Sequence, residues 1–141
     1  QNELGKIANL FNRDGGPTPP IGISVPQAMY DDFVEICKPV KNINPDFPFE
    51  VKVAKPRKRP TSTGGTDASV FAVEGVPTYG FTTDDIKGYN FSYGEIWHTE
   101  RDLYTKKIPE YQEHTAVVTA RVALGVANLD KQLSREGMYK E

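Results

Sequence analysis

The sequence is short of the residue types on which several common kinds of site depend. Its 141 residues include one cysteine, one tryptophan and two histidines. A single cysteine excludes both an intrachain disulfide and a zinc site built from several cysteines. No stretch approaches the roughly 18 consecutive apolar residues of a membrane-spanning helix. A net charge of −2 gives no general attraction to nucleic acid or to an anionic membrane. The remaining expectation is a globular chain with the length of one domain, residues 1–141.

Strand-like and helix-like segments alternate along the chain. The patterns typical of strands fall at residues 6–16, 21–25, 48–54 and 76–83. The patterns typical of helices fall at residues 26–43, 66–75 and 108–133. This alternation predicts an α/β fold, a three-layer sandwich with a mixed, mostly parallel sheet of about four strands. We expect the long C-terminal helix to be largely buried, because small and branched apolar residues nearly encircle it between Ala116 and Leu129.

Candidate ligand residues follow three of the predicted strands. Asp14 follows the first strand, Thr66 and Asp67 follow the third, and His98 lies in the long loop after the fourth. Ligands gather at the carboxyl ends of strands in α/β sheets, and a carboxylate with an imidazole suits Zn²⁺. Each residue also has an ordinary structural interpretation: an Asp-Gly-Gly turn, a helix N-cap, or a hydrogen-bonded histidine.

The order of these segments resembles a known family. "NLFNRDGG", "GGTDASVFAVEGVP" and "IWHTERDLYTKKIPE", followed by a long helix, are similar to the C-terminal half of the co-catalytic di-zinc exopeptidases. That family includes the bacterial leucyl aminopeptidases and the carboxypeptidase Q-like enzymes. The resemblance runs from Ile7 to about Leu133 and implies half of a phosphorylase/hydrolase-like zinc exopeptidase fold, so that the chain would be the C-terminal fragment of a larger peptidase domain.

The resemblance implies that Asp14 and His98 bind different zinc ions of a two-zinc site. The family takes its first histidine ligand, its bridging aspartate and a Glu-Glu pair, which includes the general base, from the half that would precede Gln1. No His-x-Asp motif and no Glu-Glu pair occurs in the present sequence. We therefore expect zinc to be absent or weakly bound in this chain, and the chain alone to be inactive.

Other residues would support the site. The resemblance places Asp67 and Thr66 beside the metals, Trp97 and Thr99 on either side of the imidazole, and Asp102 as a carboxylate that fixes the loop. A tyrosine that polarises the substrate carbonyl in some relatives has no direct match here, and Tyr89 and Tyr93 are the candidates to replace it. Ala68 stands where aminopeptidases often have histidine.

The complete enzyme implied by the resemblance hydrolyses peptide bonds near a chain end through a metal-activated water. Aminopeptidase, carboxypeptidase and dipeptidase activities stay open, and the resemblance favours a secreted or periplasmic location. A non-catalytic binding or interaction module with the same fold is the alternative. If upstream strands are missing, an exposed sheet edge predicts a homodimer or a strand-swapped assembly.

Three remaining features have ordinary interpretations. A cluster of basic residues, in which no aromatic residue is interleaved as a nucleic-acid site would require, is interpreted as a solvated loop. Its members are Lys52, Lys55, Arg57, Lys58 and Arg59. His114 is interpreted as a packing or surface residue, and Cys37 as a small core residue.

Overall fold

A three-stranded mixed sheet lies at the centre of the fold. The structure, a computed structural model, describes residues 3–140. The strands are β1 (Pro20–Val25), β2 (Glu50–Val53) and β3 (Phe81–Thr83), in the order β2-β1-β3. The central strand β1 runs parallel to β2 and antiparallel to β3. The α/β class and the mixed sheet predicted from the sequence are therefore confirmed.

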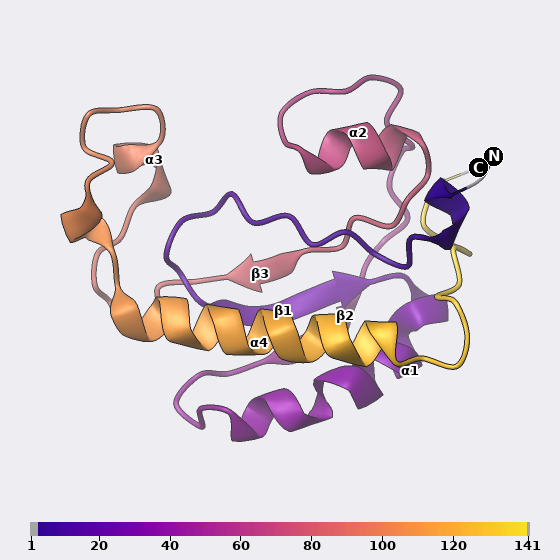
Figure 1. Cartoon of the computed structure of the whole chain (residues 1–141), viewed down its shortest axis with the longest axis horizontal. Helices are drawn as coiled ribbons and strands as arrows, with labels where there is room; N and C mark the ends of the chain where they lie inside the picture. Colours follow the sequence, from indigo (N-terminus) through magenta and orange to yellow (C-terminus); the bar gives the residue numbers. More distant parts are fainter. Residues whose placement is uncertain (1–2, 141) are drawn as a thin grey trace.

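The helices differ greatly in length. The two long ones are α1 (Gln27–Cys37), which continues as a 3-10 helix (Lys38–Asn42), and α4 (Pro109–Ala127). The short ones are α2 (Ala68–Val73), α3 (Tyr93–Ile96) and the 3-10 turns Leu4–Lys6 and Tyr104–Lys106. In Figure 1, α4 and the strands run across the molecule, α1 lies below them, and α2 and α3 stand above. None of the helices described for residues 3–140 is long and apolar enough to cross a membrane.

The core forms where α1 and α4 pack on each other and on β1. Each element contributes side chains that are almost completely buried. They are Ile23 and Val25 from β1, Met29, Phe33 and Ile36 from α1, and Val118, Val122 and Val126 from α4. The two helices approach closely at Gly125, since a Cβ at that position would lie 2.5 Å from Cγ2 of Ile36. Cys37 is buried here, as expected.

The prediction of a strand at residues 6–16 is wrong. This segment runs beside residues 77–80 but forms no strand pair with them. The side chain of Asn9 makes the hydrogen bonds that backbone groups of a neighbouring strand would make. The amide Nδ2 of Asn9 donates to the Tyr79 carbonyl at 3.0 Å, and the Tyr79 amide donates to Oδ1 of Asn9 at 3.0 Å. The Leu10 amide donates to the Pro77 carbonyl at 2.8 Å. The sheet of residues 3–140 consequently has three strands where about four were predicted.

The C-terminal helix is shorter and more exposed than predicted. α4 ends at Ala127 and not near Leu133, and a single stripe of it is buried. The stripe consists of Tyr111, His114, Val118, Val122 and Val126. Val117 and Leu124 on the outer side are about half exposed, at 46% and 55%. In this structure α4 has neighbours on one side only, so its outer apolar residues have no core to enter.

Candidate functional site

Asp14 and His98 line the same groove, although they are far apart in the sequence. The groove has a volume of about 690 Å³ and lies between the loop before β1 and the segment from α3 to the start of α4. Asp102 lines it as well, together with Tyr93, Trp97 and Tyr104. The fold therefore brings the two predicted zinc ligands to one surface depression.

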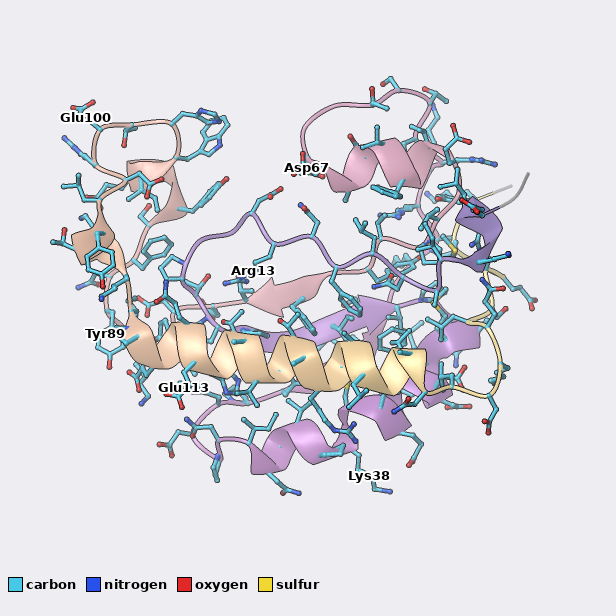
Figure 2. All side chains as sticks on the ribbon, viewed as in Figure 1. Arg13, Lys38, Asp67, Tyr89, Glu100 and Glu113 are labelled. Atoms are coloured by element: carbon cyan, nitrogen blue, oxygen red, sulfur yellow. The ribbon has the colours of Figure 1, made fainter. Side chains whose placement is uncertain are left out.

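The turn that carries Asp14 is held by backbone and side-chain contacts. Nδ2 of Asn12 donates to Oδ2 of Asp14 at 2.7 Å, and the guanidinium of Arg13 donates to the carbonyls of Gly16, at 2.6 Å, and Thr18. Burial lowers the pKa of Arg13, whose side chain points inward beneath the turn (Figure 2). Gly16 has a φ of 72°, the left-handed region that favours glycine, and a Cβ there would lie 2.7 Å from the Phe91 ring. Asp14 is thereby presented to solvent on a constrained loop.

His98 has an unusual backbone conformation just after α3. Its φ of 55° lies in the left-handed region, which residues other than glycine seldom adopt and which recurs at functional sites. The exposed Trp97 flanks the imidazole edge-on, with ring centroids 4.7 Å apart. The hydroxyl of Thr99 donates to the Glu95 carbonyl at 2.9 Å, so it caps the end of α3. Trp97 thus takes the flanking position expected of it, whereas Thr99 acts on the loop backbone.

A second hollow adjoins the groove. It has a volume of about 340 Å³ and is lined by Thr66 together with Asp14, Tyr93 and Trp97, three residues that also line the groove. Asp67 lines neither hollow. It lies at the N-cap of α2 without a side-chain capping bond, as Figure 2 shows at the start of that helix.

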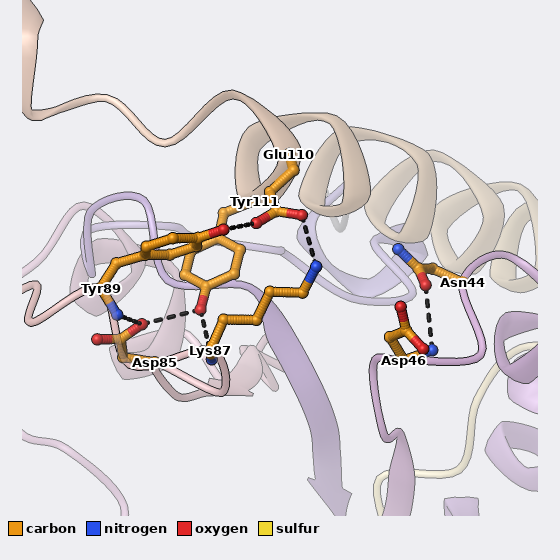
Figure 3. Close-up of polar contacts among 7 residues, drawn as sticks. All are labelled: Asn44, Asp46, Asp85, Lys87, Tyr89, Glu110 and Tyr111. Atoms are coloured by element: carbon orange, nitrogen blue, oxygen red, sulfur yellow. Dashed lines mark hydrogen bonds and ion pairs between the residues drawn. The ribbon is translucent and has the colours of Figure 1, made fainter.

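The two candidate tyrosines lie in different places. Tyr93 lines the groove and stacks on Trp97, with ring centroids 6.4 Å apart. Tyr89 lines neither the groove nor the adjoining hollow, and it donates its hydroxyl hydrogen to Glu110 (Figure 3). Its ring packs on Tyr111 at a centroid distance of 5.3 Å. Tyr93 is therefore the tyrosine that a molecule in the groove would meet.

The basic side of the groove was not predicted from the sequence. Lys106 pairs with Glu95 at 2.8 Å, and this hydrogen bond and charge lower the pKa of Glu95. Nζ of Lys107 lies 3.8 Å from the centroid of the Tyr104 ring. The signal that could have shown it was the pair of lysines in "YTKKIP", separated by Ile108 from the proline that opens α4. The groove is thus lined by carboxylates, exposed aromatic rings and the two lysine side chains.

The donor set only half fits a zinc ion. Asp14 and His98 supply the oxygen and nitrogen donors that zinc accepts, but a zinc site usually has at least three protein ligands. Within residues 3–140, no group of three histidine, cysteine, aspartate or glutamate side chains is arranged to hold a metal ion. A complete site would need donors from outside these residues.

Comparison with known proteins identifies no relative. None of the known family models, curated proteins or solved structures matches this chain.

Proposed function

We propose that this chain is the C-terminal part of a di-zinc exopeptidase of the aminopeptidase or carboxypeptidase Q-like type. The observation that supports the proposal is the shared groove of Asp14 and His98, the two residues that the sequence motifs assign to the metals. In the proposed whole enzyme, the three-stranded sheet is part of a larger three-layer sandwich. Further strands and the missing ligands come from the other half of the domain.

In this proposal the residues of the chain hold and frame the metal site. The Asp14 carboxylate and the His98 imidazole would each hold one metal ion. The turn that Arg13 clamps and the end of α3 keep these side chains in place. When bound there, zinc would supply Lewis acidity, which would activate a water molecule and polarise the peptide carbonyl. Tyr93 and Trp97 form the wall that contacts the peptide substrate. Asp102 fixes the loop and does not bind metal. The proton is moved by a glutamate from the other half.

Metal binding by the chain tests this assignment. We expect weak Co²⁺ and Zn²⁺ binding by calorimetry. Asp14→Asn and His98→Gln should each reduce it, because each removes a ligand of one metal ion. Asp67→Asn, which changes a carboxylate outside the groove, should keep it. Unchanged binding in both groove variants would refute the assignment. We also expect no turnover of dipeptides or amino-acid amides by the chain alone. Turnover that a chelator abolishes would show that the ligand set is complete.

A binding module without catalysis is the second candidate. The exposed aromatic side chains Tyr93, Trp97 and Tyr104 around the groove favour it, since they can contact a peptide without any metal. The residues encoded before Gln1 distinguish the two. A His-x-Asp motif and a Glu-Glu pair there support the enzyme, and their absence supports the binding module.

A further inference from the structure

The outer edge of β2 carries backbone groups that no strand of residues 3–140 covers. β2 is the end strand of the sheet and pairs on one side only, with β1. Val53, at the end of β2, is 48% exposed although it is apolar. An end strand with free amide and carbonyl groups is a template for pairing with another chain.

The register between β1 and β2 shows which groups of β2 face outward. The Ala54 amide donates to the Val25 carbonyl at 2.7 Å, so Ala54 faces β1. Backbone groups of a strand alternate in direction, so Lys52 also faces β1. Phe49, Val51 and Val53 then direct their N–H and C=O groups to the open side. All three residues have an amide hydrogen to donate, since none is proline.

When two copies of β2 pair in one particular register, their charged residues are complementary. Glu50 and Lys52 lie on the same face of the sheet and pair with each other at 3.1 Å, in an exposed contact of small energetic value. In an antiparallel pair of two β2 strands centred on Val51, Glu50 of each copy stands opposite Lys52 of the other. Opposite charges in that position stabilise a strand pair, and like charges destabilise it.

The apolar residues match in the same register. Side chains alternate between faces, so Phe49, Val51 and Val53 share the face that packs against α1. Val51 of one copy stands opposite Val51 of the other, and Val53 stands opposite Phe49. Phe49 and Val51 also line an open hollow of about 370 Å³ beside α1, with Val34 and Cys37. Val53 of the second copy would therefore be placed at the rim of this hollow, whose lining also includes the charged residues Glu35, Lys38 and Lys41.

We propose that two copies of this chain form a symmetric dimer through antiparallel pairing of their β2 strands, with Val51 at the two-fold axis. The outward N–H and C=O groups of Phe49, Val51 and Val53 then pair across the axis. On one face of the paired strands Glu50 and Lys52 of the two copies meet, and on the other face their apolar side chains meet. This inference requires β2 to remain an end strand, so the further strands of the proposed whole enzyme would have to join the sheet at β3.

A charge exchange tests the register. Analytical ultracentrifugation over a concentration series should show a dimer for the unchanged chain. Glu50→Lys or Lys52→Glu alone should weaken it by about tenfold, because two attractive pairs become repulsive. The double variant with both changes should restore it. Circular dichroism checks that each variant folds. A monomer at all concentrations, or a dimer insensitive to the single changes, would overturn the proposal.

A thiol cross-link tests the position of the axis. Val51→Cys places two thiols opposite each other in a hydrogen-bonded pair, with Cα atoms about 5.5 Å apart, within the range of a disulfide. Oxidation should give a covalent dimer in high yield. Val117→Cys, on the exposed side of α4, is the matched control and should give little. Equal cross-linking by both variants, or cross-linking by the control alone, would refute β2 as the interface.

Discussion

The side-chain amide of Asn9 pairs with both backbone groups of Tyr79. It donates to the carbonyl and accepts from the amide, each at 3.0 Å, as a neighbouring strand would. Tyr79 is buried at 8% exposure, so these backbone groups have little access to water. Together with the bond from the Leu10 amide to the Pro77 carbonyl, this pair holds the chain that leads to Asp14 beside residues 77–79.

Asn9→Ala should lower the free energy of unfolding by about 2 kcal/mol, because it leaves a buried donor and a buried acceptor without partners. Asn12→Ala is the control, since the Asn12 side chain bonds only to the exposed Asp14. It should change stability by less than about 0.5 kcal/mol. Urea denaturation measures both. Equal losses would show that the Asn9 pair adds nothing beyond a surface contact.

Tyr111 joins the loop after β3 to the start of α4. Its hydroxyl donates to Oδ1 of Asp85 at 2.8 Å and accepts from the Lys87 amide at 2.8 Å (Figure 3). The ring is completely buried, and burial raises the pKa of Tyr111 to about 12. Tyr111→Phe should lower the free energy of unfolding by about 1–3 kcal/mol, because the Lys87 amide loses its acceptor.

Tyr89→Phe is the matched control for that change. Tyr89 is exposed, and its hydroxyl bonds to a surface carboxylate, Glu110. We expect little change in its chemical denaturation midpoint. If Tyr89→Phe cost as much as Tyr111→Phe, the network would depend on the aromatic surface and not on the buried hydroxyl.

His114 should make the protein sensitive to mild acid. It is buried against Phe47, with ring centroids 4.3 Å apart, and within residues 3–140 neither ring nitrogen makes a hydrogen bond of regular geometry. Burial lowers the pKa of His114 from 6.5, while the Pro20 backbone acts in the opposite direction. The unfolded chain therefore binds a proton at higher pH than the folded chain. The stabilising effect of the neutral ring is complete above pH 6.5 and is lost as the pH falls towards the lower, folded pKa.

The comparison of the unchanged chain with His114→Leu isolates this effect. Both proteins keep the other acid-sensitive groups, including Asp85 and Glu110, whose pKa values are lowered. The difference in free energy of unfolding should change in favour of the variant between pH 7.5 and pH 5. Parallel pH profiles would mean that the His114 ring does not titrate on unfolding in this range.

Gly125→Ala should destabilise the contact between α4 and α1. The added methyl group would lie 2.5 Å from Cγ2 of Ile36, and such overpacking costs about 1–3 kcal/mol. The gain in helix propensity, about 1 kcal/mol, offsets only part of this cost. The control Val117→Ala lies on the exposed side of α4 and should be nearly neutral. A rise in melting temperature for Gly125→Ala would show that the helices separate easily.

Sequence periodicity predicted the elements whose own residues determine them. The alternation in residues 21–25 and the helical spacing of Met29, Phe33 and Ile36 correspond to β1 and α1. It failed at residues 6–16, because nothing in an apolar run shows that an asparagine side chain will replace the ladder. It also failed to predict how much of α4 is buried. When small apolar residues surround a helix, the sequence does not indicate which side packs against the rest of the protein.

The prediction of the candidate site was also partly right and partly wrong. Asp14 and His98 do line one groove. The strand expected before Asp14 is absent, however, so the reason for grouping the two residues did not hold for Asp14. Tyr89 was one of two candidates to replace the missing tyrosine of the family, but its hydroxyl bonds to Glu110 on α4 and it does not line the groove. The lysines of the groove were missed because their position depends on how the segment before α4 folds back. Contacts of this kind come from three-dimensional packing and leave no periodic signal.

The position of Trp97 gives the protein an optical property. Trp97 is the single tryptophan of the chain, and its indole is 58% exposed at the groove beside His98. All tryptophan fluorescence therefore originates at this groove. A blue shift or quenching on addition of a peptide, or of a paramagnetic ion such as Co²⁺, would report an event at the groove without any label.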